Sequence, residues 1–338
     1  MYATLTLPAG QELSAPRRSP TVRVRSADEL RNALRQARGQ ALTLDASGMD
    51  RVLRVDTKRG LLEVQAAASW AELVKYLGQH KIDLEAFARL PGLPSTVGES
   101  VSLASPGPDG LPVCAHVAAM TLVSPDGDLR RADRDNNPEL LKLVLGGQGA
   151  LGVLYSLTLT TESLRQSAAN AVAPVELGVP ETAPAAAAST LECLLPPQEL
   201  DAYLKDVRSL LEERRLVLLG ISVRRHLPDD SCRLNWATRE WAGVEIRFGM
   251  KSTLGASVAA AEVRRALLAA AIARGGSFPI RDTRDATRAQ LAACYPTLND
   301  FLAEKRRGDP ADRLHNAWTR RIAASLRADS CDVRWAKN

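Results

Sequence analysis

The segment Gly146-Gly-Gln-Gly-Ala-Leu-Gly-Val153 separates a predicted helix from a predicted strand, and this junction decides how the first half of the chain is organised. The helix begins at Asn136-Asn-Pro138 and runs through Leu145, where the first glycines end it. An apolar strand follows over Val153–Thr160. Glycines at such a junction permit a positive φ and a close approach of the backbone to a ligand. The segment is therefore either a ligand-binding loop or an ordinary turn.

A second glycine-containing stretch lies upstream, within the Pro-, Gly- and Ser-rich residues 91–112, which cannot be regular throughout. Backbone N–H groups presented beside glycine can hold a phosphate without a charged side chain. Ordinary turns use the same residue types, so both interpretations stay open for the two stretches. The candidate phosphate contacts are Gly98, Gly107, Gly146, Gly147, Gly149 and Gly152.

Capping residues and periodicity place regular elements on both sides of these stretches. Ser26 and Glu29 form the capping box of a helix that ends at Gly39. Ser69 caps a second helix over Trp70–Gly78. Alternation predicts strands over Leu42–Asp45, Val52–Val55, Leu61–Gln65, Ala118–Val123 and Val153–Thr160.

The second half begins again as strand, helix and strand, after an Ala/Pro-rich stretch with little pattern. Helices are predicted over Pro197–Arg214, Val258–Arg274 and Leu291–Lys305. The pattern lacks the regular βαβ repeat of a Rossmann domain, so the predicted fold class is α+β. The predicted parts are a loose leader (1–20), a first domain (21–165), a connection (166–187), a second domain (188–290) and a tail that returns to the first domain (291–338).

Composition restricts the class of function. The 338 residues are 45% hydrophobic and 25% charged, which is the composition of a globular protein. The net charge is +5, but aromatic residues make up only 4% and the basic residues are scattered, so we expect no nucleic-acid partner. The basic pI of about 9.1 fits an anionic small molecule. No apolar run is long enough to span a membrane.

The cysteines and histidines indicate no metal site. The five cysteines lie far apart without a CxxC pair, and the four histidines are isolated in sequence. An uneven number of cysteines and an N-terminus without an apolar signal core favour a reduced, cytoplasmic compartment, with peripheral membrane attachment as an alternative.

The order of motifs along residues 21–160 resembles that of the vanillyl-alcohol-oxidase, PCMH-type FAD-linked oxidases. Leu44–Leu53 resembles the strand and turn that follow the first nucleotide loop of this superfamily. Glu63–Leu73 resembles its segment V-x-A-G-x-x-W-x-x-L, and Leu90–Gly98 the stretch that lies against flavin and pyrophosphate. The segments Ser124–Gly127, Asn137–Leu140 and Gly146–Val153 follow in the superfamily's order.

The C-terminal half is similar to the tail of decaprenylphosphoryl-ribose 2-oxidases and their bacterial relatives. The similar segments are Gly275–Arg284, Cys294–Phe301 and Lys305–Pro310. In those enzymes a sugar alcohol is oxidised to a ketone and a hydride passes to the flavin. The resemblance implies a two-part PCMH-type FAD-binding domain, a second antiparallel-sheet substrate domain, and oxidation of an alcohol carbon of a sugar, polyol or lactone.

The resemblance also assigns residues to sites. It implies noncovalent FAD, and Arg281 as the group that orients the substrate oxygen, with Lys251 as a second cation. The alternatives are a surface arginine and a solvated lysine. The implied cofactor-binding residues are Thr96, Val97, Gly98, Ser100, Gly107, Gly146, Gly147, Gly149, Gly152 and Val153.

Three departures from the superfamily lie at the cofactor. The helix that ends at Gly39 runs almost directly into the strand at Leu42, so most of the first diphosphate loop is missing, including the position of a flavin-linked histidine. Glu99 stands where the superfamily has a second glycine, and a carboxylate there would repel a diphosphate by on the order of 1–4 kcal/mol. Ala104-Ser-Pro-Gly107 replaces the motif N-x-H-G.

The substrate side departs as well. Phe278 and Arg281 stand where the subgroup has a tyrosine and a lysine, and a guanidinium does not reproduce the compact ammonium of lysine. Two functions follow from this pattern. The chain is an FAD-dependent oxidase with a shortened loop, or it is a flavin-free member of the superfamily that acts as a binding or structural subunit.

Overall fold

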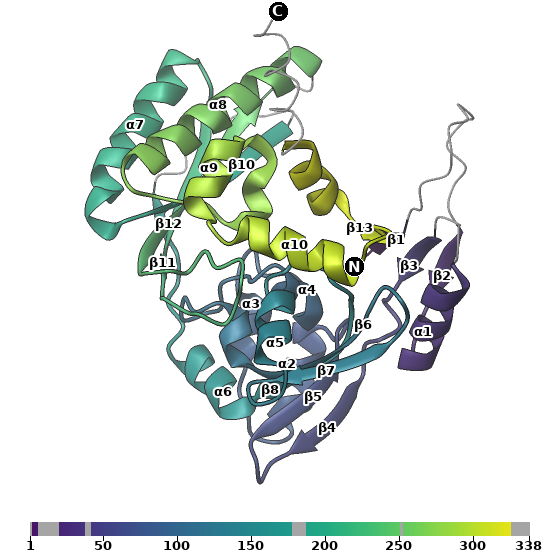
Figure 1. Ribbon diagram of the computed structural model, residues 1–338. Helices are drawn as coiled ribbons and strands as arrows, with labels where there is room; N and C mark the ends of the chain where they lie inside the picture. Colours follow the sequence, from purple (N-terminus) through teal and green to yellow (C-terminus); the bar gives the residue numbers. More distant parts are fainter. Residues whose placement is uncertain (1, 6–19, 38–41, 178–186, 251–252, 326–338) are drawn as a thin grey trace, which may run out of the picture. The chain divides into compact units, whose positions relative to one another are not determined.

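The computed structural model describes residues 2–5, 20–37, 42–177, 187–250 and 253–325 (Figure 1). The chain divides into two compact units, each assembled from separate stretches of sequence. Unit 1 comprises residues 1–171, 230–235 and 297–323, and unit 2 comprises residues 172–229, 236–296 and 324–338.

Unit 1 contains two sheets. The larger sheet has five antiparallel strands in the order β4-β5-β8-β6-β7. The smaller sheet has four strands in the order β13-β1-β3-β2, in which β2 runs parallel to β3 and the other pairs are antiparallel. The strands are β1 (Tyr2–Leu5), β2 (Thr21–Arg23), β3 (Leu42–Asp45), β4 (Val52–Asp56), β5 (Leu61–Gln65), β6 (Val117–Val123), β7 (Leu129–Asp133), β8 (Val153–Thr160) and β13 (Leu314–His315).

Local capping fixes where several helices of unit 1 begin. Ser26 caps α1 and Ser69 caps α2 by accepting a backbone N–H three residues on, as the sequence predicts. Thr96 caps α4 in the same way. The helices of this unit are α1 (Ala27–Gln36), α2 (Trp70–Gly78), α3 (Glu85–Arg89), α4 (Val97–Ser102), η1 (Val113–His116), α5 (Pro138–Val144), α6 (Thr161–Ala169) and α10 (Leu298–Gly308).

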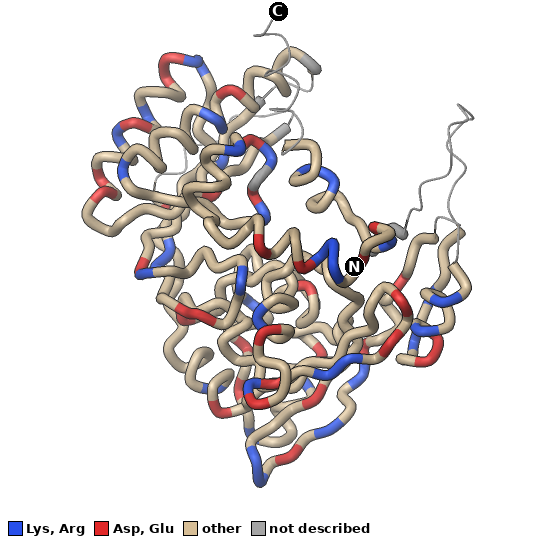
Figure 2. The backbone as a smooth tube through the Cα atoms, in the orientation of Figure 1, with Lys and Arg blue, Asp and Glu red and all other residues tan. Residues whose placement is uncertain are grey.

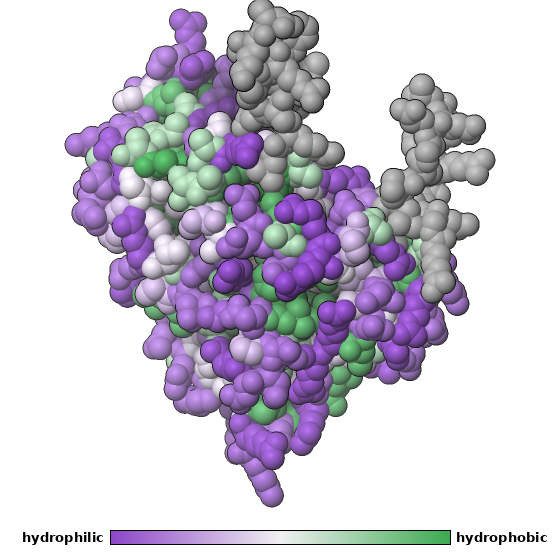
Figure 3. Space-filling model, viewed as in Figure 1, coloured by the Kyte–Doolittle hydropathy of each residue, from purple (hydrophilic) through white to green (hydrophobic). Residues whose placement is uncertain are grey.

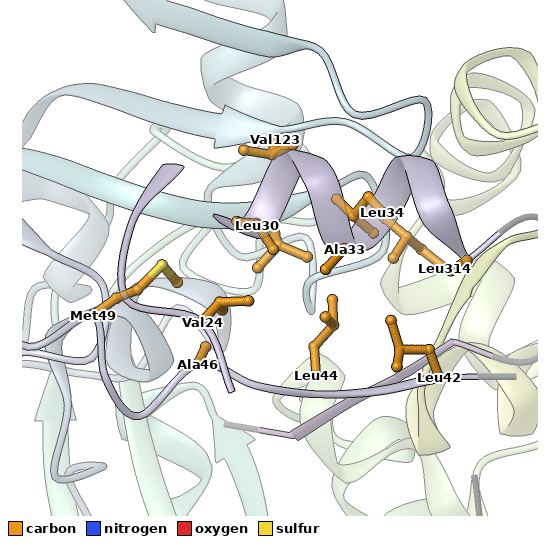
Figure 4. Close-up of a cluster of buried hydrophobic side chains, with 12 residues drawn as sticks. Val24, Leu30, Ala33, Leu34, Leu42, Leu44, Ala46, Met49, Val123 and Leu314 are labelled. Atoms are coloured by element: carbon orange, nitrogen blue, oxygen red, sulfur yellow. The ribbon is translucent and has the colours of Figure 1, made fainter. Parts of the chain in front are cut away.

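An apolar cluster joins α1 to both sheets of unit 1 (Figure 4). Leu30 and Leu34 of α1 point toward Leu44 of β3, and Val123 at the end of β6 lies on the other side of the helix. Leu314 of β13 completes the cluster, so residues from both ends of the chain contribute to one core. Burial of these side chains holds the small sheet against the large one.

The structure differs from three predictions about irregular or continuous segments. The prediction of an irregular leader over residues 1–20 is wrong at β1, because Tyr2–Leu5 pairs with β3. The predicted connection over residues 166–187 includes the end of α6 and a short strand over Val175–Leu177. The single predicted helix over Leu291–Lys305 is two helices, since Pro296 lacks an N–H and disfavours helical geometry at the residue before it.

Unit 2 is an antiparallel sheet covered by helices. Its strand order is β10-β12-β11-β9, and the helices α7 and α8 pack against each other (Figure 1). The fold class is α+β, as predicted. The elements are β9 (Val175–Leu177), β10 (Ala187–Leu195), η2 (Pro197–Glu199), α7 (Leu200–Glu213), β11 (Leu218–His226), β12 (Trp241–Met250), α8 (Leu254–Ala273), η3 (Ile280–Asp285) and α9 (Arg288–Cys294).

Charge is mixed along both units. Basic and acidic residues lie close together along the backbone in Figure 2, without a long stretch of one sign. On the face in Figure 3, hydrophobic residues form small groups among hydrophilic ones. Within the described residues, no helix combines the length and apolarity needed to cross a bilayer.

The cluster around α1 gives a stability prediction. We expect Leu34→Ala to lower the free energy of unfolding by about 2–5 kcal/mol, because Leu34 is fully buried and its removal leaves a cavity. Leu129→Ala is the matched control, since Leu129 is 49% exposed. Urea denaturation of both variants tests this, and equal losses would contradict the assignment of the core.

Candidate functional site

A buried cluster of charged side chains lies on one face of the unit 2 sheet. Cys193 of β10 contacts Tyr203 of α7, so this face of the strand is the one covered by helices. Because side chains alternate across a strand, Glu192 projects from the opposite face. Its register partner on the central strand β12 is Glu245. The face away from the helices therefore carries Glu192 and Glu245.

His226 reaches Glu192 across the central strand. The Nε2 atom of His226 on β11 lies 3.2 Å from Oε1 of Glu192 on β10, although β12 separates the two strands. Gly243 of β12 provides the space, because a Cβ atom there would lie 2.1 Å from His226 Nε2. The ring of Trp236 packs edge-on against the imidazole, with centroids 5.1 Å apart. A glycine on the central strand is thus a requirement of this contact.

Arg281 pairs with the other carboxylate oxygen of Glu192. Its Nη2 atom donates to Glu192 Oε2, and its Nε lies 3.7 Å from Asp282 Oδ2. The Arg281 side chain is 27% exposed and that of Glu192 is 11% exposed, so the pair is largely withdrawn from water. The structure thus places Arg281 in a carboxylate cluster of η3 and the sheet; its catalytic role stays a prediction.

The two carboxyl groups of the cluster, Glu192 and Asp282, have very different pKa values. Burial opposes ionisation of Glu192, but Arg281 and the hydrogen bond with His226 outweigh it and lower the pKa of Glu192 to about 2. Burial raises the pKa of Asp282 to about 6, against the effect of Arg281 and with the support of Glu192. Glu192 is therefore an ionised hydrogen-bond acceptor, whereas Asp282 can take up or release a proton near neutral pH.

Sequence reasoning missed three members of this cluster. Glu192 is a lone acid in an apolar strand, and Asp282 is adjacent to the predicted Arg281. A buried acid in a strand is a usable signal, because such a group needs a partner. His226 gives no such signal, since its contact depends on Gly243 of another strand. The second predicted cation, Lys251, lies outside the described residues.

The predicted cofactor-binding N–H groups are used within unit 1. The N–H of Gly98 donates to the carbonyl of Ala66 at 2.8 Å, and that of Val97 donates to Ala68 at 2.9 Å. Further N–H groups of the predicted set also donate to carbonyls of the chain. These donor–acceptor pairs are Ser100 with Thr96, Gly107 with Leu111, Gly146 with Val101 and Gly147 with Val144.

The glycines in the predicted set allow close packing of the chain on itself. A Cβ atom on Gly98 would lie 2.5 Å from the carbonyl oxygen of Ala66, and one on Gly147 would lie 2.3 Å from that of Leu143. Gly152 packs against Leu122 in the same manner, at 2.1 Å. These glycines therefore bring two backbone segments, or a backbone and a side chain, together.

The remaining predicted residues divide into core, cap and open positions. Val153 is buried in the apolar cluster around α1. The side chain of Thr96 accepts the N–H of Glu99 at 3.3 Å, and Glu99 is half-buried in the first turn of α4. Gly149 has a φ of +68°, and a Cβ atom there would meet only Asn316 Nδ2, at 3.8 Å. Gly149 is thus the one predicted glycine of this segment with open space beside it.

The predicted donors do not fit a diphosphate in this structure. A phosphate oxygen needs N–H groups that are free of other acceptors, and the six N–H groups just described have acceptors in the chain. Residues 38–41, between α1 and β3, lie outside the described residues. Among the described residues, no cluster of three or more His, Cys, Asp and Glu side chains suits a metal ion.

The sequence of unit 1 matches a known domain family. Residues 18–133 match the family described as FAD binding domain. L-galactono-1,4-lactone dehydrogenase 2, mitochondrial, of Oryza sativa subsp. japonica is 34% identical over 113 residues, which are 33% of this chain and 19% of that protein. The Brassica oleracea L-galactono-1,4-lactone dehydrogenase is 30% identical over 149 residues, 40% of this chain and 24% of that protein. The matches thus span about a fifth of the relatives' length.

Two solved structures have a similar fold. A variant of Physcomitrella patens BBE-like 1 aligns with a TM-score of 0.63 and 12% identity, over 88% of this chain and 90% of that one. An alkyldihydroxyacetonephosphate synthase aligns with a TM-score of 0.57 and 11% identity, over 87% of this chain and 75% of that one. The chain thus has an α+β fold in which residues 18–133 match an FAD binding domain, and this match supports FAD as the cofactor.

Asp282 gives a pH-dependence prediction. A carboxyl group whose pKa is raised on folding stabilises the fold fully below its ordinary pKa of 3.8, and this contribution is lost as the pH rises through about 6. Asp282→Asn removes this titration. We therefore expect the variant to gain stability relative to the parent between pH 4 and pH 7.

Urea midpoints at several pH values between 4 and 7 measure this difference. Asp201→Asn, at an exposed position of α7, is the control. A constant difference between Asp282→Asn and the parent over this range would contradict the assignment.

Proposed function

We propose that this chain is an FAD-dependent oxidoreductase that oxidises an alcohol carbon of a sugar, polyol or lactone. The observation that carries the proposal is the match of residues 18–133 to the FAD binding domain family. The partial matches to L-galactono-1,4-lactone dehydrogenases support it. A bound flavin would supply the hydride acceptor for such an oxidation, and a protein group would receive the hydroxyl proton.

The proposed substrate class rests on two independent likenesses. The matched relatives are named for the dehydrogenation of L-galactono-1,4-lactone, the cyclic ester of a sugar acid. The segments Gly275–Arg284 and Cys294–Phe301 resemble those of decaprenylphosphoryl-ribose 2-oxidases, which act on a sugar alcohol. Both substrates present several hydroxyl groups to the protein. We therefore infer a polyhydroxylated substrate, with the lactone as the first compound to test.

The cluster in unit 2 supplies groups of the required kind. Arg281 carries guanidinium donors of the kind that can orient a substrate oxygen, and it donates to Glu192. Asp282 has a pKa of about 6, which suits a group that receives a proton near neutral pH. We propose Arg281 as the orienting group and Asp282 as the proton acceptor.

A second candidate function is a flavin-free binding or structural subunit. The observation that favours it is the use of the predicted N–H donors within the chain, together with the carboxylate of Glu99 in the first turn of α4. We expect either form in a reduced, cytoplasmic setting, since the five cysteines are uneven in number and contain no CxxC pair.

The flavin content of the purified protein separates the two functions. We expect the visible absorption bands of a noncovalent flavin, released by acid, and a melting temperature that rises with added FAD. Glu99→Gln should enlarge this rise by removing a negative charge, whereas the control Glu72→Gln, at an exposed position of α2, should not. Colourless protein whose melting temperature ignores FAD in all three forms would favour the flavin-free subunit.

Turnover of a 1,4-lactone with a dye acceptor tests Arg281. The double variant Glu192→Gln/Arg281→Met removes both charges of the pair and so avoids an unpaired buried carboxylate. We expect its kcat to fall about tenfold or more, the effect of losing one good charge-assisted hydrogen bond. Arg225→Met/Glu240→Gln removes an exposed pair of the same unit and is the control. If the double variant has a lower melting temperature but an unchanged kcat, the pair of Arg281 and Glu192 has a purely structural role.

A further inference from the structure

His226 is buried in unit 2 although packing alone does not require a histidine there. Its side chain is 0% exposed, and its Nδ1 atom has no hydrogen-bond partner among the described residues. A buried polar atom without a partner destabilises a fold, whereas a phenyl ring of similar size carries no such atom. The imidazole also requires Gly243 in the central strand β12, although a glycine weakens a strand. A compensating interaction must therefore favour the imidazole.

That interaction is the contact between Nε2 of His226 and Oε1 of Glu192, at 3.2 Å. Because Glu192 is ionised, its carboxylate only accepts hydrogen bonds, so Nε2 carries a proton and donates it. In a neutral imidazole, Nδ1 then bears only a lone pair. In an imidazolium, Nδ1 would be a buried charged donor without an acceptor, which is the less favourable of the two states. The geometry thus favours the neutral Nε2–H tautomer of His226.

This hydrogen bond restricts the plane of the Glu192 carboxylate. The last side-chain torsion of a glutamate is broad and two-fold, so a single partner leaves the carboxylate free to turn. Here Arg281 of η3 donates to Oε2, and His226 of β11 donates to Oε1. With both oxygens held, the carboxylate has one orientation. The planar guanidinium of Arg281 must align with it, because a charge-assisted hydrogen bond is directional.

We propose that His226 is a positioning residue, which holds Glu192 so that Glu192 in turn orients the guanidinium of Arg281. Glu192 accepts from Nη2 of Arg281, and a fixed guanidinium plane gives the other N–H groups of Arg281 constant directions. The inference rests on the proposed function, in which Arg281 orients a substrate oxygen. It adds His226 and Gly243 as residues on which that role depends.

Three variants separate the hydrogen bond of His226 from its packing. His226→Phe keeps a buried ring and removes the donor, whereas His226→Gln restores an amide N–H near the position of Nε2. Gly243→Ala changes no polar group, but its Cβ atom would lie 2.1 Å from Nε2 of His226 and 3.3 Å from Oε1 of Glu192. Tyr203→Phe is the control, because it removes a buried hydroxyl that donates to the carbonyl of Leu267 among the helices of the same unit.

Solvent exchange of the Arg281 guanidinium N–H groups measures positioning without any turnover. NMR of the full chain with isotope-labelled arginine gives these signals, and the signal that is lost in Glu192→Gln/Arg281→Met belongs to Arg281. We expect about tenfold faster exchange in His226→Phe and Gly243→Ala, because losing a hydrogen bond to a charged group loosens the pair. We expect His226→Gln and Tyr203→Phe to exchange at the rate of the parent.

Turnover of a 1,4-lactone is the second measurement. We expect kcat to fall about tenfold in His226→Phe, since even a small displacement of a positioned group slows a reaction, and to recover in His226→Gln. In the Glu192→Gln/Arg281→Met background, His226→Phe should cause no further fall, because both changes act through the same guanidinium. A merely structural histidine would lower activity in either background.

The two measurements distinguish this inference from the proposed function. If the parent does not oxidise the lactone, the proposed function fails, and the exchange rates still decide whether His226 positions Arg281. Equal exchange in His226→Phe and the parent would overturn the positioning role. Exchange in His226→Gln as fast as in His226→Phe would also overturn it, because the ring and not its donor would then be what matters. In an active parent, an unchanged kcat in His226→Phe would have the same consequence.

Discussion

The backbone hydrogen bonds of α4 are the constraint on which unit 1 depends. A helix of six residues is not stable by itself, because nucleation costs more than so few internal bonds return. Its first N–H groups bond to carbonyls of the segment that follows β5, and its last carbonyls accept bonds from the glycine loop, with Val101 bound by Gly146 and Ser102 by Gln148. Trp70 Nε1 of α2 also donates to Ser100 Oγ at 3.0 Å. One short helix thus connects three separate segments of the chain by hydrogen bonds.

The glycine loop takes its shape from these bonds. Gly146, Gln148 and Gly149 all have positive φ values, between +56° and +68°, and for a glutamine this region is unfavourable. Gln148 is held there by its own side chain, which donates to the carbonyls of Ser102 and Gly146, and by Asn316, whose Nδ2 donates to the Gln148 carbonyl at 2.6 Å. The C-terminal part of unit 1 therefore stabilises a loop that lies far away in the sequence.

From local features of the sequence, the bounds of helices and strands can be predicted more reliably than the contacts between these elements. Strands β3, β5 and β8 and helix α2 have the predicted bounds, because alternation and a serine cap are properties of neighbouring residues. The pairing of β1 depends on a partner about forty residues away, and nothing in Tyr2–Leu5 itself identifies that partner.

The same limit applies to the site. Arg281 was predictable as a charged residue in a family segment, but its contact with Glu192 spans 89 residues of sequence. Likewise, a glycine pattern predicts that the backbone can come close to another group of atoms. It does not tell whether the approaching atom belongs to a ligand or to Ala66.

That ambiguity bears on how FAD meets this domain. A diphosphate that took the N–H groups of Val97 and Gly98 would leave the carbonyls of Ala68 and Ala66 without donors, at about 1–3 kcal/mol for each buried group. The carboxylate of Glu99 adds repulsion in the same turn of α4. An arrangement that keeps the bonds of α4 intact avoids this cost. In that arrangement the N–H groups of Val97 and Gly98 continue to stabilise unit 1 and are not also needed by FAD.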